Sequence, residues 1–137
     1  MVGGHYTYAE VPLFDNIKDL LNQDRNNYDK LGHFAQGFIP AIICREIIIR
    51  KNWITKNNAS KGKIIAFFTV CFCLAFSAFY ELIEWFVAAF TGEGADAFLG
   101  TQGYIWDTQS DMAFALLGAI IALITLSSLH DKQIRQL

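Results

Sequence analysis

The sequence predicts an all-α fold: a membrane bundle of about three transmembrane helices with an interfacial helix near the N-terminus. Hydrophobic residues make up 53% of the 137 residues and charged residues only 18%, and the mean hydropathy is positive at +0.28. Three apolar runs, at 31–49, 64–90 and 112–129, each approach the roughly 20 apolar residues that a span needs. So many apolar runs in a chain this short leave too little polar sequence to cover them in water. We therefore expect residues 1–137 to form a single integral membrane domain.

The segment 1–28 is expected to lie outside the hydrocarbon core, on the extracytoplasmic side or in the interface. Apolar residues recur at helical spacing over 11–21, with Asp15, Lys18 and Asp19 off the apolar stripe. This helix is too short and too charged to cross a membrane, so the pattern favours an interfacial helix.

Each of the three runs has features of a membrane helix. The first contains Pro40, which membrane helices tolerate, and Arg45 near its end, which we expect to reach the interface. The second, at about 40 Å, is long enough to cross the core and project beyond it. The third has no charge. Cys44, Cys71 and Cys73 lie inside these runs without a metal-ligand spacing, which predicts buried, inert thiols.

The charges of the loops predict how the chain is oriented. By the positive-inside rule, the loop between the first two spans and the C-terminus are cytoplasmic. No basic start with an apolar h-region is present, so we expect the internal helices to direct insertion. The net charge of −2 and the lack of a basic stripe argue against nucleic-acid binding. The charged residues of the first loop are all basic: Arg50, Lys51, Lys56, Lys61 and Lys63. Those of the loop between the second and third spans are all acidic: Glu93, Asp96 and Asp107.

Three pairs of ionisable residues lie near the predicted outer ends of the spans. Their spacings of three or four residues put both members of each pair on one helical face. Ionisable groups at membrane depth are costly and persist mainly where they pair, bind or react. We therefore treat the six as candidate catalytic residues that meet in one pocket: Asp29 with His33, Glu81 with Glu84, and Asp107 with Asp111.

Each pair has a chemical interpretation and a structural alternative. His33 is a candidate general base or metal ligand, with Asp29 one turn away to orient its ring. One His with several carboxylates suits Mg²⁺, Mn²⁺ or Ca²⁺ better than structural zinc. The alternatives are that Asp29, Asp107 or Ser110 only caps a helix, and that the glutamates are wetted within an aromatic belt. The candidate ligands of a divalent metal are His33, Glu81, Glu84, Asp107 and Asp111.

Other polar residues are assigned by their place in the chain. His130 lies in the predicted cytoplasmic tail and is expected to be solvated. Five residues near the motifs are candidates for substrate binding: His5, Tyr6, Tyr80, Gln102 and Gln109.

Four segments, GGHYTYAEVP, YDKLGHFAQGF, FYELIEW and GTQGYIWDTQSDM, resemble the YjdF family of bacterial inner-membrane proteins over nearly the whole chain. The spaced acids and His33, with Gly118 further on, are more distantly similar to VanZ-like proteins, which are linked to glycopeptide resistance. That second resemblance implies a polar pocket that acts on lipid or lipid-linked head groups. VanZ-like proteins often have an Arg before the Asp motif, whereas residues 64–131 contain no Arg or Lys.

The leading hypothesis is therefore an enzyme that hydrolyses or transfers the head group of a phospholipid or polyprenyl lipid at the outer face of a bacterial inner membrane. The alternatives are a non-catalytic lipid- or cation-binding protein and an assembly subunit. A cation path through the membrane is poorly supported, because 64–76 is almost entirely apolar. The expected partner is membrane lipid.

Overall fold

The structure, a computed structural model, describes residues 10–22, 24–55, 60–91 and 103–136. Within these ranges the chain forms helices and no strands, which confirms the all-α prediction. The helices are α2 (Pro12–Leu20), α3 (Tyr28–Arg50), α4 (Lys61–Thr91) and α6 (Asp107–Ile134).

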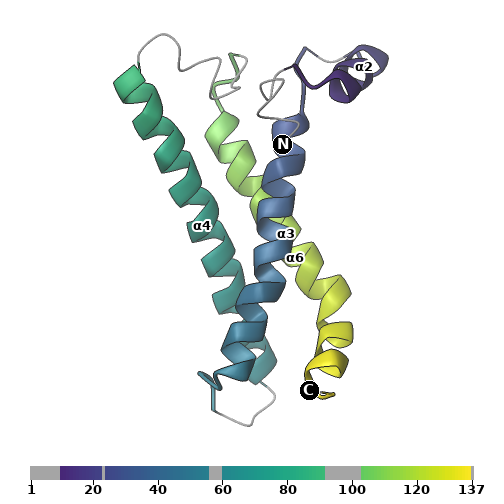
Figure 1. Cartoon of the computed structure of the whole chain (residues 1–137), viewed down its shortest axis with the longest axis vertical. Coiled ribbons are helices and arrows are strands. Elements are labelled where there is room, and N and C mark those ends of the chain that lie inside the picture. Colours follow the sequence, from purple (N-terminus) through teal and green to yellow (C-terminus); the bar gives the residue numbers. More distant parts are fainter. Residues whose placement is uncertain (1–9, 23, 56–59, 92–102, 137) are drawn as a thin grey trace.

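Helices α3, α4 and α6 are each long and apolar enough to cross a membrane. They run in alternating directions, so the N-terminal ends of α3 and α6 lie beside the C-terminal end of α4 (Figure 1). Helix α2 lies at this same end of the bundle, which we call the α2 end. Reversal of the chain at each connection thus brings the three acid-bearing motifs to one level.

Helices α3 and α6 make the most extensive contact in the bundle because small residues line their interface. A Cβ placed on Gly37 would lie 1.7 Å from the carbonyl oxygen of Ala115, and one on Gly118 would lie 2.1 Å from that of Phe34. The two backbones therefore touch, and only glycine fits at these crossings. The buried alanines of the same interface are Ala41, Ala115, Ala119 and Ala122.

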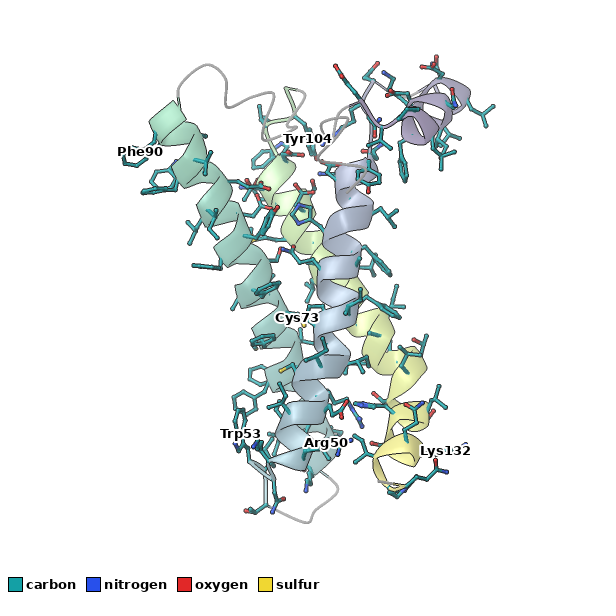
Figure 2. The ribbon with its side chains drawn as sticks, in the orientation of Figure 1. Arg50, Trp53, Cys73, Phe90, Tyr104 and Lys132 are labelled. Carbon is teal, nitrogen blue, oxygen red and sulfur yellow. The ribbon has the colours of Figure 1, made fainter. Side chains whose placement is uncertain are left out.

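Helix α4 contributes a narrower face to the bundle. Cys73 is fully buried on this face, and Figure 2 shows it midway along the helix, beside α3. Phe72 and Phe76, by contrast, are exposed, as expected of side chains that contact lipid. Cys71 is also exposed and Cys44 is half-buried, so the prediction of buried thiols is right only for Cys73. Cys71 is exposed because α4 is apolar on all sides but packs against its neighbours on one side only.

The long helices begin earlier than the apolar runs do. The residues at the N-cap positions of α3 and α6 are Asn27 and Trp106, and neither side chain makes a capping hydrogen bond. Asp29 and Asp107 lie inside the first helical turn, and the Ser110 hydroxyl donates to the Asp107 carbonyl at 2.9 Å. None of the three is therefore an N-cap residue, although Asp29 Oδ1 accepts from the Lys30 backbone N–H at 2.8 Å within the first turn.

Helix α2 is held against α3 by a fully buried asparagine. The Asn26 side-chain amide donates to the Val11 carbonyl at 3.1 Å and to Asp15 Oδ1 at 2.9 Å. Its Oδ1 accepts from the Tyr28 backbone N–H at 3.0 Å. One side chain thus joins both ends of the turn between the helices. Helix α2 and the residue that follows it expose an apolar set, Leu13, Ile17, Leu20 and Leu21.

A second polar cluster joins α3 to α6 at the opposite end of the bundle, where Figure 2 labels Arg50 and Lys132. Arg45 donates to His130 Nδ1 at 3.0 Å and to Asp131 Oδ1 at 2.5 Å. An arginine only donates, so Nδ1 accepts, and Nε2 then donates to Glu46 Oε2 at 3.3 Å. The prediction of a solvated His130 is wrong, since this residue is over 90% buried. Arg45 is also over 90% buried, but its partner Asp131 is partly exposed, and its position at the interface stays a prediction. Helix α6 continues past residue 129 and turns His130 toward α3.

Candidate functional site

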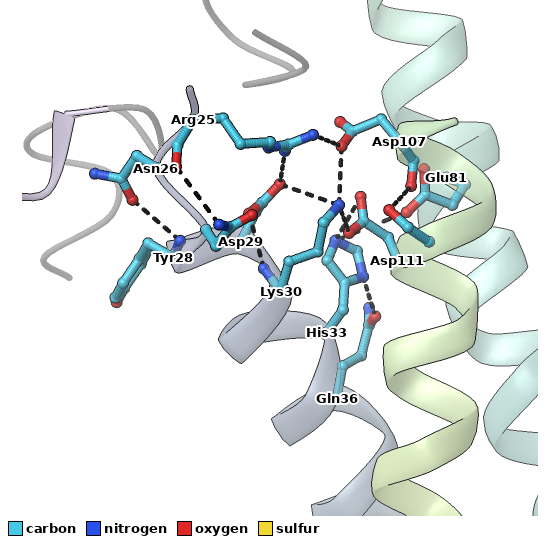
Figure 3. A network of polar contacts seen from close by, with 12 residues as sticks. Arg25, Asn26, Tyr28, Asp29, Lys30, His33, Gln36, Glu81, Asp107 and Asp111 are labelled. Carbon is cyan, nitrogen blue, oxygen red and sulfur yellow. Dashed lines mark hydrogen bonds and ion pairs between the residues drawn. The ribbon is translucent and has the colours of Figure 1, made fainter. Parts of the chain in front are cut away.

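The six ionisable residues singled out in the sequence gather at the α2 end. Figure 3 labels all of them except Glu84. Helix α3 supplies Asp29 and His33, α4 supplies Glu81 and Glu84, and α6 supplies Asp107 and Asp111. All are buried except Glu84, which is half-buried. The glutamates are therefore not simply wetted above the hydrocarbon. The helical spacing of each pair and the alternating helix directions together account for this convergence.

Lys30 lies at the centre of the aspartates. Its Nζ is 2.6 Å from Asp111 Oδ1, 2.9 Å from Asp107 Oδ1 and 3.6 Å from Asp29 Oδ2. The lysine side chain is only 9% exposed, so these carboxylates replace the water that its ammonium would otherwise bind. A single cation thus ties the first turn of α3 to the first two turns of α6.

Arg25 provides a second cation from the segment between α2 and α3. One guanidinium nitrogen donates to Asp29 Oδ2 at 2.6 Å and the other to Asp107 Oδ1 at 2.7 Å. The Tyr104 ring lies 5.2 Å from the guanidinium carbon and 5.7 Å from Lys30 Nζ, a cation–π arrangement. Arg25 and Lys30 therefore join the segment before α3, the first turn of α3 and the start of α6.

His33 is held by a neighbour on its own helix. Its Nδ1 is 3.0 Å from Gln36 Oε1, and an amide oxygen only accepts, so Nδ1 bears the proton. Gln36 thus fills the orienting role expected of Asp29, which binds Arg25 instead. The other ring nitrogen, Nε2, is 3.7 Å from both Glu81 Oε1 and Asp111 Oδ2. The imidazole therefore directs one nitrogen at two carboxylates from different helices.

A polar cavity of about 170 Å³ opens beside this imidazole. Asp29, His33, Glu84 and Asp111 line it, and the Tyr80 ring closes one wall with an edge-on contact to the His33 ring, 5.9 Å between centroids. The cavity thus combines a nitrogen base with carboxylates from all three long helices.

A larger groove of about 600 Å³ lies next to the cavity, between α2, α3 and α6. Its walls are mostly apolar and include Phe14, Ile17, Phe34 and Phe114. Lys18, Arg25 and Lys30 add positive charge to the same walls. Since Lys30 also contacts Asp111 of the polar cavity, the two spaces share a boundary at this side chain.

The candidate substrate-binding residues divide into three groups. Tyr80 lines the polar cavity. Gln109 is exposed on α6 and is not among the residues that line the cavity. His5, Tyr6 and Gln102 lie outside the described residues.

A family model described as "Predicted membrane protein (DUF2238)" matches residues 1–132. The chain belongs to the DUF2238 family. A curated relative, "Inner membrane protein YjdF" of Escherichia coli (strain K12), is 52% identical over 136 residues, which make up 99% of this chain and 63% of that relative. This DUF2238 chain therefore spans less than two thirds of the relative's length. No solved structure matches it.

These matches and the three apolar helices show that this DUF2238 member is a multi-pass inner-membrane protein. They support the resemblance to the YjdF family, whereas a link to VanZ-like proteins stays a prediction.

Sequence reasoning missed Arg25, Lys30 and Gln36 in this DUF2238 protein. The signals were present: Arg25 is four residues before Asp29, and Gln36 is three residues after His33. Lys30 gave a weaker signal, because a lysine at the start of a span usually reaches water. Its burial follows from the approach of α6, which local spacing does not encode.

Proposed function

We propose that this protein is an enzyme that hydrolyses or transfers the head group of a phospholipid or polyprenyl lipid. The supporting observation is the adjacency of a polar cavity and an apolar groove at one end of three membrane helices. A lipid has the same two parts, so its head group matches the cavity and the start of its chain matches the groove. Lys18, a basic side chain of the groove wall, suits a phosphate of such a lipid.

The residues around the cavity suit a proton-transfer mechanism. A base accepts the proton of the attacking water or alcohol as the new bond to phosphorus forms. An acid then protonates the ester oxygen that leaves. His33 and Glu84 are our candidates for these exchanges or for metal binding, since both line the cavity from different helices. Lys30 and Arg25 are positioning residues, because their nitrogens bind the aspartates.

We place the site on the extracytoplasmic side of the inner membrane. Arg50, Lys51 and Lys61 lie at the end of the bundle opposite the acid cluster, and positive charge favours the cytoplasmic side. We expect a fluorescent protein fused after Leu137 to fluoresce and alkaline phosphatase fused there to be inactive. The reverse pattern would place the acid cluster in the cytoplasm and contradict this orientation.

We expect three variants, His33→Ala, Glu81→Gln and Asp111→Asn, to lower lipid turnover by roughly 10²-fold or more. The reason is that His33 and Asp111 line the cavity and Glu81 Oε1 lies 3.7 Å from His33 Nε2. The assay incubates the purified chain with vesicles of phosphatidylglycerol, phosphatidylethanolamine or a polyprenyl diphosphate, and detects products by mass spectrometry. Glu46→Gln, at the other end of α3, is the matched control and should keep full turnover. Folded wild-type protein that changes none of these lipids more than the three variants do would rule out the proposal.

One observation favours the alternative of a non-catalytic lipid- or cation-binding protein, or an assembly subunit. Asp29 and Asp107 are already neutralised by Arg25 and Lys30, as in a structural ion-pair network. In that case the same variants would change lipid retention or stability, with no turnover by the wild-type chain.

A further inference from the structure

Three atoms from three different helices face one another beside the polar cavity. They are His33 Nε2, Glu81 Oε1 and Asp111 Oδ2, and the nitrogen is 3.7 Å from each oxygen. One ligand atom from each residue lies within 4.8 Å of the others. Cis ligands of an octahedral ion with bonds near 2.1 Å are about 3 Å apart, so shifts of up to about 1 Å by each side chain would close the set.

The burial of Glu81 is not explained by the ion pairs that Arg25 and Lys30 make. Its side chain is only 7% exposed, and Oε1 is buried without a hydrogen-bond partner among the residues that the structure describes. An unsatisfied carboxylate oxygen in such a place costs several kcal/mol unless something binds it. The same oxygen is the one that faces His33 Nε2.

Each of the three residues is held through its other polar atom. Gln36 accepts from His33 Nδ1, which leaves the lone pair of Nε2 free. Lys30 binds Asp111 Oδ1 and leaves Oδ2 free. A side-chain hydrogen bond to Thr108 holds the Glu81 carboxylate by its second oxygen, since Oε1 makes none. Outer partners that orient ligands in this way are typical of protein metal sites.

The charges of the cluster also favour a cation. Five carboxylates gather here against two basic side chains, Arg25 and Lys30, an excess of three negative charges when all are ionised. A divalent ion would offset two of them in a setting where uncompensated charge is costly. The carboxylates are Asp29, Glu81, Glu84, Asp107 and Asp111.

We propose that His33, Glu81 and Asp111 bind one divalent metal ion through Nε2, Oε1 and Oδ2. One imidazole with two carboxylates suits Mn²⁺, and two of the three residues, His33 and Asp111, line the cavity. The use of this ion in head-group chemistry rests on the proposed function, whereas its binding does not. Glu84, on the cavity wall, is then the residue placed to exchange protons with a ligand of the metal.

The test is a titration of the purified full chain, stripped with a chelator, with Mn²⁺ alone. Calorimetry should give one ion per chain, and electron paramagnetic resonance should show the signal of bound Mn²⁺. We expect Glu81→Gln and Asp111→Asn to weaken binding by at least about tenfold, and Gln36→Leu by about tenfold through loss of ring orientation. Glu46→Gln is the matched control, because Glu46 also contacts a histidine, His130, on a neighbouring helix.

Equal Mn²⁺ affinity in wild type and Glu81→Gln would overturn the proposal, as would no binding by folded wild type. A protonated His33 between two carboxylates would then account for the geometry. The two proposals fail separately. Lipid turnover by a chain that does not bind Mn²⁺ removes the metal site alone, and Mn²⁺ binding without lipid turnover removes the enzyme alone.

Discussion

Lys30→Met is expected to destabilise the protein by about 3–5 kcal/mol, because it leaves a group of buried aspartates without their shared cation. Methionine has nearly the same length, so the loss reports charge rather than packing. The measurement is the free energy of unfolding of the purified chain in a detergent titration. Asp111, which now accepts from Nζ at 2.6 Å, loses its closest cation, whereas Asp107 keeps Arg25 at 2.7 Å.

Two further variants separate this effect from a general loss of positive charge. Lys132→Met, in the exposed last turn of α6, should leave the free energy of unfolding nearly unchanged. Adding Asp111→Asn to Lys30→Met should recover part of the loss, since it removes one of the unpaired charges. Equal stability of Lys30→Met and Lys132→Met would show that the buried network contributes nothing to the fold.

Gly37→Ala is expected to destabilise the bundle by about 1–3 kcal/mol or more, because the new methyl group would lie 1.7 Å from the Ala115 carbonyl oxygen. A backbone carbonyl cannot move aside by a change of rotamer, as a side chain can. Helices α3 and α6 must therefore move apart to make room for the methyl group. The same detergent titration measures the change. Because His33 and Asp111 stand on these two helices, separation should also weaken Mn²⁺ binding.

Gly32→Ala is the control on the same helix, since nothing lies within 4 Å of the position that its new methyl group would take. A glycine replaced by alanine in open helix gains about 0.5–1 kcal/mol. The two substitutions are chemically identical and should have opposite signs. Destabilisation of equal size in both would mean that the backbone contact at Gly37 is not what limits the approach of the helices.

The positions of the acid motifs follow from the sequence by simple rules. Spacings of three and four residues decide which side chains share a helical face, as for His33 with Asp29. Run lengths decide how often the chain crosses, and so which helix ends lie at one level. These rules are local, and they were enough to bring six residues from three helices to one end of the bundle.

The rotation of each helix about its own axis was not predictable in the same way. A span that is apolar on all sides gives no preferred inward face, so the exposure of Cys71 and the burial of His130 could not be read from periodicity. Contacts between helices, such as Lys30 with Asp111, depend on this rotation. Small residues at Gly37 and Gly118 were the signal that fixes it for α3 and α6.

The unequal packing of the three helices divides the site into two halves. Helices α3 and α6 touch backbone to backbone and hold His33 and Asp111 in a fixed frame. Helix α4 contacts this frame less extensively, and its ribbon diverges from α3 toward the α2 end (Figure 1). Glu81 and Glu84 thus stand on the helix that is held least by its neighbours. A ligand that draws Glu81 toward His33 would therefore pull this end of α4 toward α3 and narrow the space between the two helices.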